Sequence, residues 1–314
     1  MGRFWSRWPR PMPDQIRIIE VAPRDGLQNE IEVVPTPVKA EFIRSLAAAG
    51  LREIEATSFV HPKWVPQLAD AADLLTGLGP IPGVRISTLV PNEKGLERAV
   101  GLGVQAIAVF TAASEAFVQK NINMTVDESL AVFDRVIQSY RGQIPNGFVR
   151  GYLSTVVECP FSGRVSPGRV AELVAKLFEL GCDEVSLGET IGVAIPAEVV
   201  GVAREVEKVT SQSKIAWHFH DTRGTAIANV SAMLDRGYRS FDSSAAGLGG
   251  CPYAPGAGGN LATEDLVYFA ERSGLATGVD LEALARCSAP VLQVLGRPAT
   301  AKSQLAVLAA CKSL

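Results

Sequence analysis

The sequence predicts an α/β fold, specifically a closed (β/α)₈ TIM barrel with additional C-terminal helices. From Ile16 onward, short β-branched segments alternate with longer amphipathic segments, which is typical of parallel strands separated by crossover helices. About eight strand candidates follow one another at even intervals, as this barrel requires. The chain has 314 residues without an internal linker or low-complexity tract. This length fits a single barrel domain.

The strand candidates are short runs rich in β-branched residues. They read IRIIEVAP from Ile16, EIEATSF from Glu53, VRISTLV from Val84, AIAVFTA from Ala106, FVRGYLSTV from Phe148, DEVSLGE from Asp183, KIAWHFHD from Lys214 and SFDSSAAG from Ser240. Between them, apolar residues recur at helical spacing in segments such as VKAEFIRSLAAAG, VDESLAVFDRVIQSY and GRVAELVAKLFELG. An open doubly wound sheet is the alternative, but no G-x-G-x-x-G motif follows the first strand. After about Leu275 we expect extra helices packed on the barrel.

Composition limits the partners and the compartment. We expect residues 1–14 to be a disordered leader, because prolines interrupt MGRFWSRWPRPMP, and residues 15–314 to be a single domain. Thirty basic and 33 acidic residues give a net charge of −3, which does not favour nucleic acid. No apolar run reaches the roughly 18 residues of a spanning helix, so no membrane partner is expected. Five dispersed cysteines without a CxxC pair indicate a reducing, cytoplasmic compartment.

Polar residues gather where the predicted strands end, which is where barrels of this class carry their catalytic groups. They are Arg24 and Asp25 on the first strand, Glu55 and Ser58 on the second, Glu189 and Thr190 on the sixth, His218, His220 and Asp221 on the seventh, and Asn260 after the eighth.

His218 and His220 are separated by one residue, so strand alternation places both imidazoles on one face, here the barrel interior. A buried histidine is often only a hydrogen-bonded core residue, and the pair alone leaves that alternative open. Asp25 and Asn260 would add a carboxylate and an amide oxygen at the same rim. This mixed set, completed by water and substrate, fits Mg²⁺ or Mn²⁺ better than tetrahedral zinc. Such an ion can chelate a hydroxy-acid or hydroxy-carbonyl substrate.

Two further features allow a structural and a functional interpretation. Arg24 is either a salt-bridge donor or a fixed cation that stabilises an oxyanion or enolate. The glycine-rich segment AGLGGCPYAPGAGGN, from Ala246 to Asn260, is either a plain surface or phosphate-binding loop or a lid that closes over substrate. Cys251 within it is either a small buried hydrophobe or a thiol that exchanges a proton.

The chain resembles the 3-hydroxy-3-methylglutaryl-CoA lyases, which are metal-dependent carbon–carbon lyases built on a barrel. The resemblance runs from about Ile16 to the C-terminus and is carried by VAPRDGLQNE, IEATSFVHPKWVPQLAD, AASEAFVQKNIN, VRGYLSTVVECPF, SLGETIGV, HFHDTRGTAIAN and AGLGGCPYAPGAGGNLATEDLVY. It implies the metal ligands Asp25, His218, His220 and Asn260. It also implies that Arg24 faces the nascent enolate, that Cys251 is the catalytic cysteine, and that Glu55 and Glu189 match carboxylates of the family's site.

The implied reaction is a retro-Claisen cleavage of an acyl-CoA to acetoacetate and acetyl-CoA, the chemistry of leucine degradation and ketone-body formation. Four positions depart from the family pattern: Ala22 for Gly, Ile31 for Lys, Glu189 for Asp and Arg223 for Tyr. Glu189 and Arg223 motivate one alternative, a lyase of a related 3-hydroxy-3-alkylglutaryl-CoA. A non-catalytic barrel that binds metal or acyl-CoA is the alternative from a different class. A homo-oligomer, most simply a dimer, is expected from general frequency.

Overall fold

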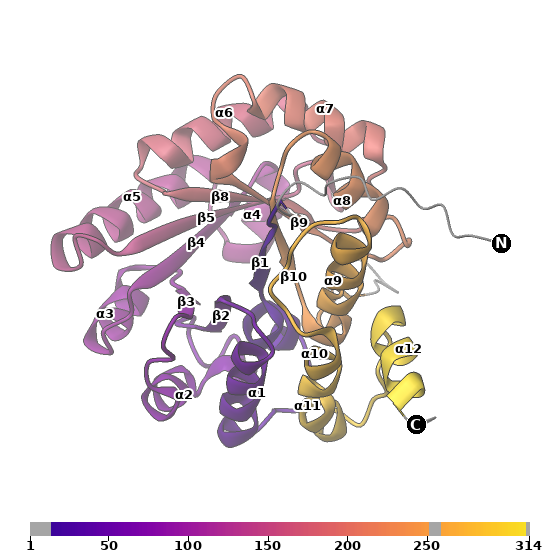
Figure 1. The fold of residues 1–314 in the computed structure, drawn as a ribbon. Helices are drawn as coiled ribbons and strands as arrows, with labels where there is room; N and C mark the ends of the chain where they lie inside the picture. The colour runs from indigo at the N-terminus through magenta and orange to yellow at the C-terminus, as the bar shows by residue number, and fades with distance from the viewer. Residues whose placement is uncertain (1–13, 251–258, 312–314) are drawn as a thin grey trace.

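A closed barrel of parallel strands forms the centre of the structure, a computed structural model that describes residues 14–250 and 259–311 (Figure 1). Within these residues the strands close in the order β1-β10-β9-β8-β5-β4-β3-β2. Their bounds are β1 Arg17–Glu20, β2 Glu53–Ser58, β3 Arg85–Leu89, β4 Ala106–Ala112, β5 Phe148–Ser154, β8 Glu184–Glu189, β9 Ile215–Phe219 and β10 Ser240–Ser243. Every one of the eight predicted strands is confirmed, and the barrel is closed rather than an open sheet.

Side-chain alternation divides each strand between the helices and the barrel interior. On β9, Trp217 and Phe219 are buried in the large apolar core between strands and helices. Ala216 faces the interior, where it packs with Ile19 and Val21 of the β1 segment. Parallel strands covered on both faces in this way are buried along their whole length, as β9 is.

Helices surround the barrel, as Figure 1 shows. Their bounds are α1 Thr36–Ala48, α2 Ala71–Leu78, α3 Glu93–Gly101, α4 Glu115–Ile122, α5 Val126–Gln143, α6 Pro167–Glu179, α7 Pro196–Val206, α8 Ala226–Asp235 and α9 Thr263–Arg272. The predicted helical segments are confirmed as α1, α5 and α6. Helix α5 begins with a capping box in which the Thr125 hydroxyl accepts from the Glu128 amide and the Glu128 carboxylate accepts from the Thr125 amide.

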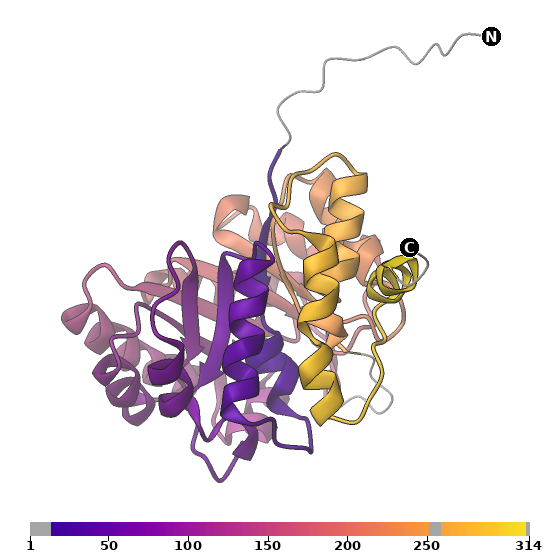
Figure 2. The same cartoon turned by 60° about the horizontal axis from the view of Figure 1, so that its bottom comes forward.

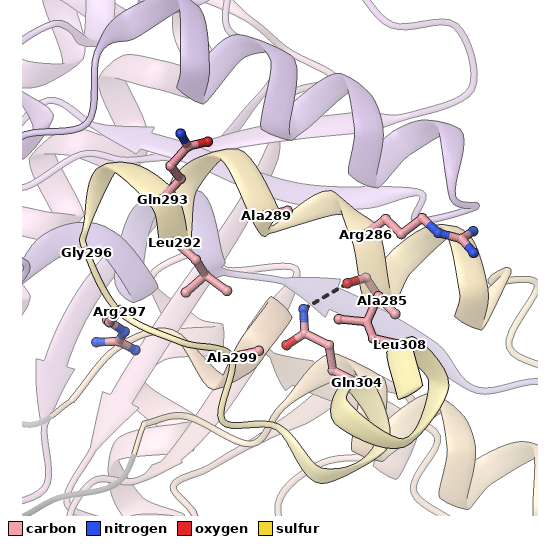
Figure 3. A pocket seen from close by; sticks show the side chains of 10 residues that line it. All are labelled: Ala285, Arg286, Ala289, Leu292, Gln293, Gly296, Arg297, Ala299, Gln304 and Leu308. Atoms are coloured by element: carbon pink, nitrogen blue, oxygen red, sulfur yellow. Dashed lines mark hydrogen bonds between the residues drawn. The ribbon is translucent and has the colours of Figure 1, made fainter. Parts of the chain in front are cut away.

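The predicted C-terminal helices are present as α10 Leu281–Cys287, α11 Ala289–Val294 and α12 Lys302–Cys311. They lie outside the barrel, where α10 and α11 contact α1 and α12 contacts α9 (Figure 2). A hollow of about 450 Å³ opens between the three helices (Figure 3). The buried amide of Gln304 donates to the Ala285 carbonyl at 2.9 Å and to the Ser288 hydroxyl at 2.7 Å. These hydrogen bonds connect α12 to α10 and to the residue between α10 and α11.

Several short elements lack a sequence signal because they are below the length at which periodicity is visible. They are the antiparallel pair β6 Glu158–Cys159 and β7 Gly163–Arg164 and the short helices η1 Ala22–Gly26, η2 Pro66–Leu68, η3 Gln212–Lys214 and η4 Ala245–Gly247. Of the predicted leader, residues 1–13 lie outside the described residues, and Asp14 pairs with Arg239 at 2.6 Å. In the described ranges, no helix combines the length and apolar character needed to cross a membrane.

Two buried carboxyl groups, those of Glu20 and Glu264, accept hydrogen bonds from backbone amides of η4. Glu20 accepts hydrogen bonds from the Ala22 and Ala245 amides and from the Thr263 hydroxyl. Glu264 accepts from the Ala246 amide. Burial raises the pKa of Glu20 to about 7 and that of Glu264 to about 8, against an ordinary value of 4.5. The folded chain therefore holds these protons more tightly than the unfolded chain.

We predict that the free energy of unfolding falls as pH rises from about 5 to 8, because the raised pKa values make proton loss from the folded state costly. Glu264→Gln removes one such group and should reduce this fall by at least about 1 kcal/mol. Urea denaturation across this pH range measures both slopes. Glu41→Gln, at an exposed position on α1, is the matched control. An unchanged slope in Glu264→Gln would show that burial does not raise this pKa.

Candidate metal and catalytic site

A cavity of about 700 Å³ opens at the carboxyl ends of the barrel strands. Its lining includes Arg24 and Asp25 from η1, Ser58 at the end of β2, and the two histidines of β9 and the residue after it, His218 and His220. The cavity therefore lies where the sequence pattern placed the polar residues. The alternation expected for the H-x-H pair holds, because both imidazoles face the cavity.

Three of the predicted ligands form one cluster. Ligand atoms of Asp25, His218 and His220 lie within 4.8 Å of one another. Asn260 joins them through its amide nitrogen, which donates to Asp25 Oδ2 at 2.9 Å, while its Oδ1 lies 3.1 Å from His218 Nε2. The Asn260 side chain lies close to the backbone of Gly249. Only glycine fits at this position, because a Cβ there would lie 2.7 Å from the Asn260 amide nitrogen and the φ angle is +109°.

The donor chemistry of this cluster suits a divalent cation. His220 Nδ1 lies 2.8 Å from the Glu189 carbonyl oxygen and His218 Nδ1 lies 3.2 Å from Asp242 Oδ2, so the opposite nitrogen of each ring is available to the site. Two imidazole nitrogens, the Asp25 carboxylate and the Asn260 amide oxygen make a mixed nitrogen and oxygen set. Mg²⁺ and Mn²⁺ accept such ligands together with water.

Charges around the cluster keep its carboxylate ionised. Burial raises the pKa of Asp25, but Arg24, His218 and His220 outweigh it and hold the pKa below its usual value. Burial, reinforced by the neighbouring His218, lowers the pKa of His220 to about 4. Burial also lowers the pKa of His218, but the hydrogen bond and charge of Asp242 produce a net rise. Cation binding thus competes with a proton mainly at His218.

Arg24 is a buried cation held on two sides. Its guanidinium contacts Glu55 Oε2 at 2.6 Å and Asp25 Oδ1 at 2.7 Å, and it lies over the ring of Tyr152, 5.3 Å from the ring centroid. Tyr152 in turn donates to Glu55 Oε2 at 3.1 Å. Burial opposes the charge on Arg24, but Glu55 and Asp25 more than compensate, so its pKa stays above its ordinary value. Arg24 is therefore both a salt-bridge donor and a fixed cation at the cavity.

The side chains of Glu189 and Arg223 do not line the cavity, and Cys251 lies outside the described residues. The carboxylate of Glu189 accepts from the Val193 amide at 3.0 Å, beneath its own loop. Arg223 donates to the carbonyl oxygens of Ile191 and Gly192, each at 3.1 Å. Neither side chain is among the described residues that line the cavity. Cys251 belongs to residues 251–258, which the structure does not describe.

Sequence reasoning missed a layer of polar residues beneath the cluster. It contains Arg150 and Tyr152 of β5, Ser186 of β8 and Asp242 of β10. A signal existed for two of them, because Arg150 and Tyr152 are spaced by two residues, as His218 and His220 are, and therefore share the interior face.

Comparison with known proteins shows the family of this chain. A family model described as HMGL-like matches residues 15–291. The mitochondrial hydroxymethylglutaryl-CoA lyase of Bos taurus is 50% identical over 290 residues, which covers 92% of this chain and 89% of the relative. The human mitochondrial enzyme is 47% identical over 291 residues, with 93% and 89% covered. The chain belongs to the hydroxymethylglutaryl-CoA lyase family.

Solved structures of this lyase family share the fold over nearly the whole chain. The lyase of Pseudomonas aeruginosa superposes with a TM-score of 0.92 at 45% identity and covers 95% of this chain and 99% of its own. A lyase of Acinetobacter baumannii, in complex with coenzyme A and 3-methylmalate, has a TM-score of 0.87 at 37% identity, with 92% and 94% covered. The closed barrel of this lyase family member is therefore shared with experimentally solved relatives.

We predict that His218→Ala lowers Mn²⁺ affinity by at least about 100-fold, because the cluster loses a ligand and its link to Asn260. Titration calorimetry on metal-stripped protein measures the dissociation constant. His61→Ala is the matched control, since His61 also lines the cavity but is absent from the cluster. Equal Mn²⁺ affinity in all three proteins would place the cation elsewhere.

Proposed function

We propose that this protein cleaves 3-hydroxy-3-methylglutaryl-CoA into acetoacetate and acetyl-CoA with the help of Mg²⁺ or Mn²⁺. The observation that carries the proposal is the juxtaposition of Arg24 with the Asp25, His218 and His220 cluster in one cavity. The chain that carries this cavity is 50% identical in sequence to the hydroxymethylglutaryl-CoA lyase of Bos taurus. The coenzyme A bound to the Acinetobacter relative supports an acyl-CoA substrate here.

The reaction breaks the bond between C2 and C3 of the acyl chain. The C3 hydroxyl loses its proton, its oxygen becomes the ketone of acetoacetate, and the bonding electrons leave with C2 as the enolate of acetyl-CoA. The enolate then takes one proton at C2, so the atoms balance without a further reactant. Asp25, His218, His220 and Asn260 would hold the divalent cation, which would supply the Lewis acidity that lowers the pKa of the substrate hydroxyl.

The chain's own residues provide the electrostatic part of the reaction. Arg24 is held by Glu55 and Asp25, so it presents a fixed positive charge to the thioester oxygen on which enolate charge develops. Because the guanidinium is already oriented, little reorganisation is required when charge forms. The ionised Asp25 is placed to favour loss of the hydroxyl proton, and Cys251 or a water supplies the final proton to C2.

The alternative substrate, a related 3-hydroxy-3-alkylglutaryl-CoA, depended on the departures at Arg223 and Glu189. Both side chains form hydrogen bonds with the loop that follows β8. Arg223 donates to two carbonyl oxygens, and Glu189 accepts from an amide. Neither therefore offers a reason for a larger acyl group. A non-catalytic barrel is disfavoured by the retention of Arg24 and the four ligand residues in one geometry.

A cytoplasmic location and a homodimer belong to the same proposal. The five dispersed cysteines support the reducing compartment, although the mammalian relatives are labelled mitochondrial. The frequency of symmetric dimers supports the oligomeric state. Fractionation of the native cells and sedimentation of the purified chain test these two statements.

We predict that metal-stripped protein releases acetyl-CoA from 3-hydroxy-3-methylglutaryl-CoA only after Mg²⁺ or Mn²⁺ is added. A coupled assay for acetyl-CoA, run beside larger 3-alkyl homologues, measures both activity and preference. Preference for the methyl compound is the expected result, because Glu189 and Arg223, the two residues that differ from the family pattern, are not among the described residues that line the cavity. Faster turnover of a larger homologue would favour the alternative substrate, and no turnover of any homologue would favour the non-catalytic barrel.

Arg24→Lys should lower kcat by about 100-fold or more while Mn²⁺ affinity changes little. Lysine keeps the charge but cannot contact Glu55 and Asp25 together through a planar fork. Steady-state kinetics and calorimetry on the same preparation separate the two effects. Retention of full kcat would show that Arg24 is only a structural ion-pair partner.

A further inference from the structure

Asp242 lies behind the metal cluster, in the middle of β10, and is 1% exposed. Three groups from other strands of the barrel face its carboxylate. Arg150 pairs with Oδ1, the Ser186 hydroxyl donates to Oδ2 at 2.7 Å, and His218 Nδ1 lies 3.2 Å from Oδ2. The register of the sheet sets the last contact, because Asp242 and His218 are cross-strand neighbours on parallel β10 and β9.

An ionised carboxylate only accepts hydrogen bonds, so its contacts determine where the proton of His218 lies. The ion pair with Arg150 and the hydrogen bond from the Ser186 hydroxyl stabilise the ionised form of the Asp242 carboxylate. The ring nitrogen facing this carboxylate must then be the donor. In the neutral ring the lone pair is then left on Nε2, the atom that lies 3.1 Å from Asn260 Oδ1 and 3.9 Å from Asp25 Oδ2.

We propose that Asp242 is a positioning residue that keeps the proton of His218 on Nδ1 and thereby presents Nε2 to the divalent cation. Arg150 and Ser186, from β5 and β8, prevent the carboxylate from turning away. The proposal rests on the proposed function only in assuming a cation at this cluster. It distinguishes the two histidines, because His220 Nδ1 faces the neutral carbonyl oxygen of Glu189 instead of a carboxylate.

Replacement of Asp242 by asparagine creates a conflict among donors. Arg150, Ser186 and His218 all donate to the carboxylate, whereas asparagine offers one oxygen and one NH₂ group. Arg150 is always protonated and retains the oxygen, so the NH₂ group turns toward His218. The ring then accepts at Nδ1 and carries its proton on Nε2, where it blocks the cation. Loss of such an outer contact typically lowers metal affinity by about 10- to 100-fold.

The first experiment reads the tautomer directly in the metal-free wild-type protein. The chain has only three histidines, so ¹⁵N-histidine labelling gives three resolvable ring systems in long-range ¹H–¹⁵N spectra. His61→Gln and His220→Gln spectra assign them. At about pH 9, where a histidine is ordinarily neutral, we expect His218 to carry its proton on Nδ1. A proton on Nε2 in the wild type overturns the proposal, and this measurement requires no change at Asp242.

The second experiment compares Asp242→Asn with the matched control Glu184→Gln. Glu184 contacts the other side of Arg150, at 3.0 Å, and is buried in the same network, but it does not contact His218. We expect Asp242→Asn to move the His218 proton to Nε2 and to weaken Mn²⁺ binding by about 10- to 100-fold, with Glu184→Gln within about threefold of wild type. Equal weakening in both variants, or an unchanged tautomer in Asp242→Asn, would reduce Asp242 to a structural role.

These readouts are independent of the proposed reaction. A wild-type chain with the expected tautomer and Mn²⁺ affinity but without acyl-CoA cleavage would contradict the proposed function and leave the role of Asp242 intact. A chain that cleaves the acyl-CoA while His218 carries its proton on Nε2 would do the reverse.

Discussion

The barrel interior depends on one constraint: carboxylates must neutralise the positive charges of two buried arginines. Arg150 contacts Asp242 and Glu184, and Arg24 contacts Glu55 and Asp25. An unpaired charge at such depth destabilises a fold by about 3–5 kcal/mol, so Arg150 requires Glu184 of β8 and Asp242 of β10, and Arg24 requires Glu55 of β2. A shift of one residue in any of these strands would turn a partner toward the helices. The buried ion pairs therefore select one sheet register.

That register also creates the site. Asp242 is the cross-strand neighbour of His218 and also pairs with Arg150, so the carboxylate that neutralises this arginine also orients a ligand. The Tyr152 hydroxyl connects the two arginine groups, because it accepts from Arg150 at 3.2 Å and donates to Glu55 at 3.1 Å. The contacts of Asp242 thus both compensate a buried charge and orient a ligand.

Most of the fold was predictable because strand candidates and helical periodicity are local properties of the sequence. The cavity position of His218 and His220 followed from alternation along one strand. The same rule, applied to β8, places Ser186 and Gly188 inward and Glu189 on the opposite face, where its carboxylate contacts its own loop. The contact of Arg223 with Ile191 was not predictable, because it joins loops after two different strands and depends on their closeness in the barrel.

The contacts around the site form a closed circuit. Starting at the predicted ligands, hydrogen bonds and ion pairs, together with the 3.1 Å approach of His218 Nε2 to Asn260 Oδ1, connect Asp25, Asn260, His218, Asp242, Arg150, Tyr152, Glu55 and Arg24, and the last returns to Asp25. In an open chain of contacts, a displaced end group can move without affecting the others. In a closed circuit, a displacement at one member is opposed from both sides. The cation ligands and Arg24 therefore share one geometry, so the enolate-stabilising charge is placed relative to the metal cluster by the protein itself, before any substrate arrives.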